Sequence, residues 1–151
     1  MRDYRGKNKS TGKWEYGKLI SGQYVIDDRH ITAIVTLDTE FFPHCEVAYE
    51  EVDPATVGQC TGISAMDEIE GGETRPILIY EGDIVEPVLI GGNCEGFSWG
   101  RQVVIFDRGA FCVKDRRGNI TPMCNYSEMV RFKLRGNVWD NHEPMEGFTD
   151  A

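Results

Sequence analysis

The sequence has few of the features that mark secreted proteins or membrane proteins. Its five cysteines are odd in number and no two are spaced as Cys-x-x-Cys, so neither a disulfide framework nor a zinc site is indicated. No apolar run approaches the roughly 20 residues that cross a bilayer, and the first residues, MRDYRG, contain no apolar signal core. We therefore expect a cytoplasmic protein with reduced cysteines and no membrane association.

Positive charge is also scarce. The chain has 16 Lys and Arg against 25 Asp and Glu, which gives a net charge of −9 and a pI of about 4.8. Nucleic-acid binding depends mainly on Lys and Arg that neutralise phosphates, so no general affinity for nucleic acid or anionic membranes is expected. One local group of basic residues is interpreted as a solvated hairpin rim, because acids flank it. The group comprises Arg101, Arg108, Lys114, Arg116 and Arg117.

Recognisable catalytic and metal-binding motifs are missing as well. The sequence contains no phosphate loop, no Gly-x-Ser-x-Gly and no His-Glu-x-x-His. Its histidines, His30, His44 and His142, lie far apart and lack metal-ligand spacing. His44 and Cys45 are adjacent, so on a strand their side chains would point to opposite faces. We therefore predict no catalytic residue, no metal and no cofactor, and a protein that is not an enzyme.

Glycine, in contrast, is abundant, with 17 residues. Glycine supplies positive φ at tight turns, and short apolar runs between glycines are typical of β-hairpins. Residues 3–20 are predicted to form a first hairpin around a polar turn. Asp53 followed by Pro54 predicts a helical start that Gly58 ends, so at most one or two short helical turns are expected. The predicted fold class is mainly β, or a β-rich α+β chain.

The C-terminal half shows the most regular pattern of short β runs. These runs are joined by Gly-rich or Asp-containing turns, and the last of them alternates apolar with charged residues. Closely spaced strands of this kind are typical of an SH3-like barrel, which Phe106 and Phe111 would help to fill. The runs are residues 79–85, 101–106, 110–114 and 130–137.

Composition divides the chain into three parts. We expect an N-terminal β-rich region over residues 1–62, an acidic loop over 63–78 and an SH3-like barrel region over 79–151. A chain of this length also fits about one domain, so a single continuous domain over 1–151 is the alternative.

Five blocks of sequence, in order over most of the chain, resemble motifs of the YopX family, a group of proteins encoded by phages and prophages of bacteria. The resemblance implies an SH3-like barrel in the C-terminal part, preceded by a β-rich N-terminal part. It implies no activity, because a fold of this type hosts many functions. The loops at 63–78 and 86–100 are longer than the family pattern. The blocks are YRG with WEYG (4–6 and 14–17), VDPATVGQCTG (52–62), IYEGDIV (79–85), VIFDRGAF (104–111) and GNVWDN (136–141).

Three functions remain open from the sequence. The first is a non-enzymatic phage or prophage protein that contacts an unidentified protein partner and forms a homo-oligomer. The second is an acidic mimic of nucleic acid that occupies a host DNA-binding protein, with Asp67, Glu68, Glu70 and Glu73 on its surface. The third is a small-ligand or metal-dependent enzyme that uses Glu81, Asp83 and Asp140. We expect the first, because no catalytic constellation is present.

Candidate binding residues occur in three segments. Phe97 and Trp99 lie in the Gly-rich connector, where exposed aromatics could anchor an interface. At Glu81-Gly82-Asp83 a carboxylate pair is weighed against a tight turn, and the turn is favoured. In the tail, a pocket is weighed against a structural role in which Trp139 plugs the barrel end, and the structural role is favoured. The complete set is Tyr80, Glu81, Asp83, Phe97, Trp99, Trp139, Asp140 and Asn141.

Overall fold

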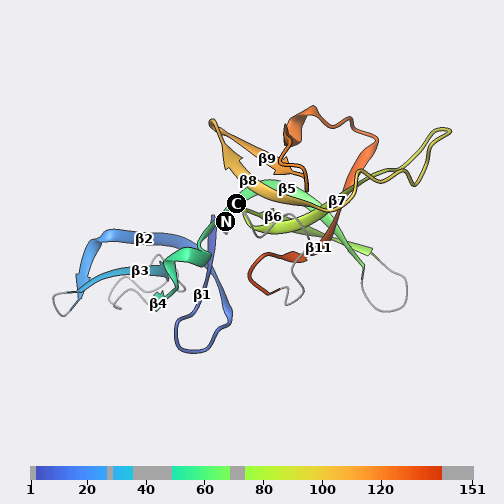
Figure 1. Ribbon diagram of the computed structural model, residues 1–151. Coiled ribbons are helices and arrows are strands. Elements are labelled where there is room, and N and C mark those ends of the chain that lie inside the picture. The colour runs from blue at the N-terminus through green and yellow to red at the C-terminus, as the bar shows by residue number, and fades with distance from the viewer. Residues whose placement is uncertain (1–2, 27–28, 36–48, 69–73, 141–151) are drawn as a thin grey trace. The chain divides into compact units, whose positions relative to one another are not determined.

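The computed structural model describes residues 3–26, 29–35, 49–68 and 74–140 (Figure 1). Over these residues the chain is mainly β, with two short 3-10 helices, which confirms the predicted fold class. The chain divides into two compact units, one up to Cys60 and the other from Thr61 onward. Each unit is described by itself.

The first unit begins with the predicted hairpin. Strands β1 (Tyr4–Lys7) and β2 (Trp14–Ile26) pair antiparallel along their shared length. The side-chain oxygen of Asn8 accepts the backbone N–H groups of Ser10 and Thr11 at 2.8 and 3.2 Å. In a sharp turn, some backbone N–H groups have no strand neighbour to accept their hydrogen bonds. The Asn side chain accepts them instead, which is why Asn is common in such turns.

Two further strands extend this hairpin into a sheet. Strand β3 (Arg29–Val35) pairs antiparallel with β2, and the short β4 (Tyr49–Glu51) pairs with β3. Ile34 on β3 is fully buried. A Cβ atom at Gly17 on β2 would collide with the carbonyl oxygen of Val35, so glycine allows the two strands to approach.

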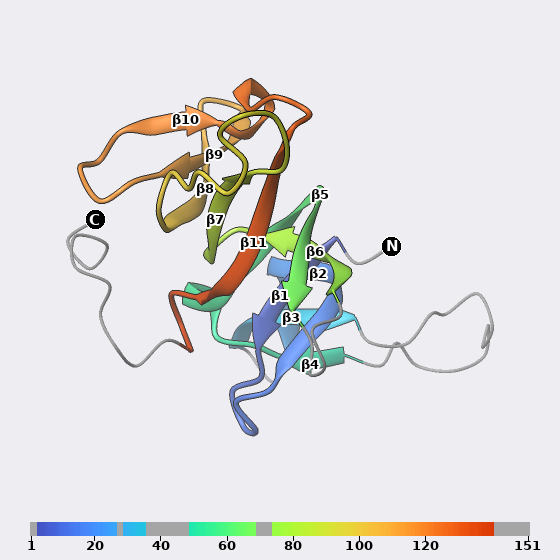
Figure 2. The same cartoon turned by 90° about the vertical axis from the view of Figure 1, so that its right-hand side faces the viewer.

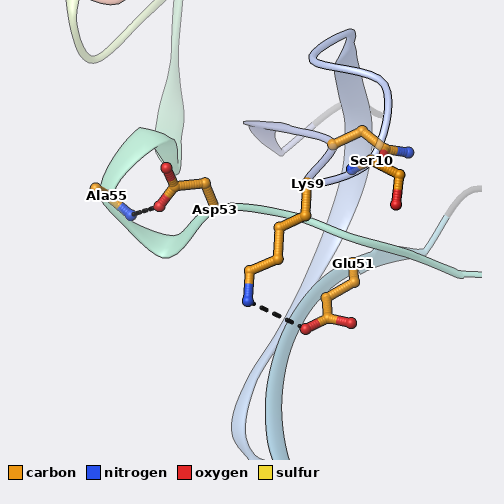
Figure 3. Close-up of polar contacts among 6 residues, drawn as sticks. Lys9, Ser10, Glu51, Asp53 and Ala55 are labelled. Carbon is orange, nitrogen blue, oxygen red and sulfur yellow. Dashed lines mark hydrogen bonds and ion pairs between the residues drawn. The ribbon is translucent and has the colours of Figure 1, made fainter.

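A single turn of 3-10 helix follows β4. In helix η1 (Pro54–Thr56), Asp53 is the N-cap and its carboxylate accepts the backbone N–H of Ala55 at 3.0 Å (Figure 3). Pro54 occupies the first turn, where its missing N–H costs nothing. The predicted helical start is therefore confirmed. Strand β5 (Gly58–Glu68) then begins by pairing with β1, which gives the strand order β5-β1-β2-β3-β4.

The second unit contains the later part of β5 and the remaining elements. The strand order is β10-β9-β8-β7-β11-β5, with β6 also beside β5, and Figure 2 shows β8, β9 and β10 side by side. Strands β7, β8, β9 and β10 each pair antiparallel with the next, whereas β11 pairs parallel with β5. The elements are β6 (Thr74–Tyr80), β7 (Asp83–Leu89), β8 (Gln102–Asp107), β9 (Ala110–Lys114), β10 (Ile120–Pro122), η2 (Met123–Asn125) and β11 (Val130–Asn137).

The core of the second unit takes one residue from each of seven elements. On β8, Val104 is 1% exposed and belongs to this core, whereas Phe106 is 49% exposed. Phe106 lies opposite Phe111 next to the hairpin turn, past the core, and the two rings pack edge to face at 5.1 Å. The prediction that Phe106 fills an interior is therefore wrong, while Phe111 does pack against the core. The core cluster is Ala65, Ile79, Val85, Val104, Val113, Met123 and Phe132.

The strands of the second unit form an open sheet. Strand β10 stands at one end of the strand order and pairs with β9, and the pairings among the described residues do not return to it from the other end. The expected SH3-like barrel is therefore not confirmed. Hairpins β8–β9 and β9–β10 follow from local turns, whereas closure requires an additional pairing between strands far apart in the sequence.

The segment expected to be an acidic loop is instead largely strand. Strand β5 continues to Glu68 and β6 begins at Thr74, so both ends of residues 63–78 are paired, while 69–73 lie outside the described residues. One face of each strand is apolar, because Ala65 and Ile79 are buried in the core. Acidic residues at the end of β5 and after it made a half-buried strand resemble a loop.

Candidate functional site

The turn between β6 and β7 holds three of the predicted site residues. A carboxylate oxygen of Asp83 accepts the backbone N–H of Tyr80 at 2.8 Å, and Asp83 is only 2% exposed. Gly82 has a φ of +87° and donates its N–H to the carbonyl of Val104 at 2.9 Å. Only glycine adopts this conformation readily, so Glu81-Gly82-Asp83 is a tight turn held by its own aspartate, as the favoured interpretation states.

A second turn, at the end of β11, packs against the first. The side-chain oxygen of Asn137 accepts the backbone N–H groups of Trp139 and Asp140 at 2.9 and 2.8 Å. Its amide donates to the Asp140 carboxylate at 3.0 Å. Val138 donates its N–H to the carbonyl of Gly82 at 2.9 Å, so two segments far apart in the sequence form one corner.

Trp139 lies over the glycine of this corner. A Cβ atom at Gly82 would come within 3.0 Å of the indole Nε1, so the close approach depends on glycine. The indole is nevertheless 42% exposed and the sheet is open, so the prediction that Trp139 plugs the barrel end is not confirmed. Asn137 caps the end of the strand, while Asn141 lies outside the described residues.

The corner brings together Tyr80, Glu81, Asp83, Trp139 and Asp140, but two of its carboxylates are engaged in holding the turns. A general acid or base needs a carboxylate that reaches substrate. The buried oxygen of Asp83 instead satisfies a backbone N–H that would otherwise be costly to bury. The geometry of the corner is therefore that of a structural joint. Within the described ranges, no three His, Cys, Asp or Glu residues gather as a metal site would need.

The other predicted residues, Phe97 and Trp99, lie on the connector between β7 and β8. This connector folds back on β7, because Leu89 donates its N–H to the Phe97 carbonyl at 2.9 Å and Trp99 donates to Pro87 at 3.1 Å. Val88 and Ser98 also form an isolated antiparallel β-bridge between the connector and β7. A Gly-rich connector thus becomes a hydrogen-bonded hairpin that holds two aromatic side chains in place.

The aromatic side chains form a row across the surface of the second unit. The rings of Phe97 and Trp99 pack edge to face at 5.0 Å, Trp99 on Tyr126 at 5.7 Å, and Tyr126 on the core residue Phe132 at 5.4 Å. Phe97 is 55% exposed and Trp99 is 41% exposed, although each is held by its neighbours. The row runs from the exposed ring of Phe97 to the core, so the exposed rings are supported by packing against buried side chains.

A hollow of about 630 Å³ runs beside this row, and we call it the aromatic groove. Most of its wall is apolar, which is the general character of a binding pocket. Sequence reasoning found Phe97 and Trp99 but missed the rest of the lining, because those residues come from segments far apart along the chain. The lining residues are Leu89, Cys94, Phe97, Trp99, Thr121, Asn125, Tyr126, Ser127 and Val130.

A second hollow, of about 460 Å³, is also lined by Trp99, and we call it the arginine hollow. Within it, Glu86 accepts the Ser98 hydroxyl at 2.6 Å and the Arg135 guanidinium at 2.8 Å. These two donors hold the pKa of the Glu86 carboxyl below its ordinary value of 4.5, although partial burial acts to raise it. The lining residues are Glu86, Trp99, Gly100, Arg101, Asp115, Arg116 and Arg117.

None of the helices in the described part of the chain is both long and apolar enough to cross a membrane. Comparison with curated proteins and with solved structures finds no match. A family model described as YopX protein matches residues 3–146, which is nearly the whole chain. Its span includes both the corner formed by the 79–85 and 136–141 blocks and the two hollows around Trp99. This chain belongs to the YopX family.

Proposed function

We propose that this YopX family member is a phage- or prophage-encoded, non-enzymatic protein-binding module that acts in the cytoplasm of a bacterial host. The aromatic groove is its binding surface, and the bound element is a peptide segment of a protein partner. The observation that carries the proposal is the exposure of Phe97 and Trp99, at 55% and 41%, on a hydrogen-bonded connector.

Physical chemistry supports this choice of surface. Aromatic side chains supply large apolar contact areas with few torsions to restrain, and they dominate the energetics of protein interfaces. Because Trp99 is already packed between Phe97 and Tyr126, little rotamer entropy is lost when a partner contacts it. An aromatic that only stabilised the fold would be expected to lie inward, as Phe132 does.

The two alternative functions have weaker support. An enzyme that used Glu81, Asp83 and Asp140 would require two carboxylates to leave the turn bonds they make at 2.8 and 3.0 Å. A nucleic-acid mimic has only the net charge of −9 to favour it. Of the acids assigned to its surface, Glu70 and Glu73 lie outside the described residues.

The proposed binding surface can be tested by peptide selection. A random displayed-peptide library is selected against the full chain and against its Trp99→Ala and Phe97→Ala variants. We expect peptides with an apolar anchor to be enriched on the wild-type chain and to lose about tenfold or more in affinity for either variant, since anchors of this type cost about 2 kcal/mol on truncation. Phe106→Ala is the matched control, because Phe106 is also exposed but lies outside the groove. Equal enrichment on all variants would contradict the proposal.

Self-association is part of the same proposal. A second copy of the chain is one possible protein partner, and most soluble oligomers are homo-oligomers. Light scattering during size exclusion should give a mass above the 17.1 kDa of one chain. A mass equal to one chain at every concentration would contradict the oligomer while leaving the peptide-binding surface to the selection experiment.

A further inference from the structure

Three arginines converge on the arginine hollow from two separate segments. Arg101 immediately precedes β8, and Arg116 and Arg117 lie in the turn between β9 and β10. The register brings the segments together, because Val103 on β8 pairs with Lys114, the last residue of β9. The sequence interpretation of these arginines as a solvated rim did not anticipate that they would surround a common hollow.

The turn that carries two of these arginines is held in a defined shape. A single carboxylate oxygen of Asp115 accepts the backbone N–H groups of Arg117 and Asn119, each at 2.9 Å. Its other oxygen accepts the Asn119 amide at 3.1 Å. Burial acts to raise the pKa of Asp115, but these hydrogen bonds outweigh it and the pKa is lowered. The carboxylate is therefore ionised near neutral pH and committed to the turn.

The three arginines of the hollow outnumber its two acids, although the charge of Arg117 does act on Asp115. The side chains of Arg101, Arg116 and Arg117 make no hydrogen bond or ion pair with any described residue. Of the two acids in the lining, Glu86 is bound by Ser98 and Arg135, and Asp115 holds its own turn. A chain with net charge −9 thus presents, at one place, three guanidinium groups that are free to form hydrogen bonds with a ligand.

Trp99 connects this charge to the proposed binding surface. Its indole forms part of the wall of both the aromatic groove and the arginine hollow. A ligand that placed an apolar side chain in the groove would extend directly toward the guanidinium groups. Planar guanidinium groups bind carboxylates and phosphates through two parallel hydrogen bonds, and carboxylates are the anionic groups that an unmodified peptide carries.

We infer that the partner segment is an acidic peptide, in which an apolar anchor occupies the aromatic groove and adjacent Asp or Glu side chains occupy the arginine hollow. This inference rests on the proposed function and specifies the chemistry of its partner. A nucleic-acid strand fits less well, because its phosphates need an extended basic track and the chain as a whole is strongly acidic.

The same peptide selection tests the inference through the charge of the selected sequences. On the wild-type chain we expect an apolar anchor flanked by Asp or Glu. A variant with Arg101→Glu, Arg116→Glu and Arg117→Glu should bind the best selected peptide about tenfold or more weakly, since each charged contact contributes about a factor of two to five. Wild-type affinity should also fall as salt rises from about 0.01 M to about 1 M, which shortens the Debye length from about 30 Å to about 3 Å.

A control variant separates local charge from net charge. Lys13→Glu, Lys18→Glu and Arg108→Glu together change the net charge by the same amount, at exposed positions that line neither hollow. This variant should keep the affinity within about threefold of the wild-type value. An equal loss in both triple variants would overturn the inference, because long-range repulsion would then explain the effect.

The outcomes also separate the inference from the proposed function. Selected peptides with an apolar anchor but no excess of acids would overturn the inference and leave the proposed function standing. No enrichment on the wild-type chain over Trp99→Ala would overturn both. A labelled thymidine oligonucleotide that bound the wild-type chain more tightly than the best peptide would also overturn the inference, and would identify the hollow as a nucleic-acid site.

Discussion

Short polar side chains that accept hydrogen bonds from their own backbone shape the turns of this protein. Asn8, Asp83, Asp115 and Asn137 each close a turn in this way. Such side chains supply bonds that a chain reversal cannot obtain from a strand neighbour. The Asp83 and Asn137 turns form the corner, and the Asp115 turn carries two of the arginines that line the arginine hollow.

Replacing the buried turn aspartate should destabilise the fold. Asp83→Ala leaves the Tyr80 N–H without this acceptor inside the protein, so we expect a loss of about 1–3 kcal/mol in the free energy of unfolding. Urea denaturation followed by circular dichroism measures it. Glu95→Ala is the control, since Glu95 is exposed and should change stability by less than about 0.5 kcal/mol. Equal stability of the two variants would argue against a structural role for Asp83.

Glu86 should make stability depend on pH in a defined direction. The Ser98 hydroxyl and Arg135 lower the pKa of Glu86 in the folded chain. Its stabilising contribution to folding is therefore present above pH 4.5, and it is lost as the pH falls through the lower pKa of the folded state. Glu86→Gln should therefore be less stable than wild type near neutral pH, and the difference should narrow below about pH 4. Urea unfolding across a pH series measures this difference in the free energy of unfolding.

The Ser98→Ala variant provides the matched test of this linkage. Removing the hydroxyl donor should raise the pKa of Glu86 in the folded chain toward its ordinary value. The stability that the chain loses on acidification because of Glu86 should therefore be smaller in this variant. A gap between wild type and Glu86→Gln that stayed constant from neutral pH to pH 3 would show that Glu86 acts through packing and not through its charge.

At the scale of elements, alternation along each strand decides which substitutions matter. Ile79 on β6 is fully buried in the core cluster, whereas Ile120 on β10 is 44% exposed. Ile79→Ala should cost about 2–5 kcal/mol, because it removes buried methyl groups and leaves a cavity. Ile120→Ala should cost less than about 0.5 kcal/mol. Thermal unfolding of both variants measures the difference, and similar losses would contradict the assigned burial.

The connector between β7 and β8 is more ordered than its composition indicates. Its glycines suggested a loop, yet it is bonded to β7 from Pro87 to Leu89. Side chains on a hydrogen-bonded hairpin lose less entropy on binding than those on a free loop. The exposed rings of Phe97 and Trp99 therefore occur at a position suited to binding.

At the scale of the whole molecule, net charge sets which partners approach. With 25 acidic against 16 basic residues, the protein repels polyanions at long range. We expect no detectable binding to duplex DNA of arbitrary sequence at about 0.15 M salt, measured by fluorescence anisotropy. The Arg101→Glu variant should behave identically in this assay. Binding that weakened steeply with salt would show that the local arginines outweigh the overall charge.

The sequence by itself determined the β class, the first hairpin, the Asp53-capped helical turn and the turn role of Asp83. Each of these depends on residues close together in the chain: alternating side chains, glycine at positive φ, and side chains that bond their own backbone. The resemblance to the YopX family was likewise carried by local blocks, and the family match over residues 3–146 confirms it.

Only the tertiary structure decided how distant segments meet. Pairing of β11 with β7 and β5 leaves the sheet open, and the β8–β9 register places Arg101 beside Arg116 and Arg117. Such contacts depend on strand order and register, which are chosen by the packing of the whole core and not by any one segment. The sequence therefore identified Phe97 and Trp99 of the aromatic groove, which lie close together in the chain. It did not identify the arginine hollow, whose arginines come from separate segments.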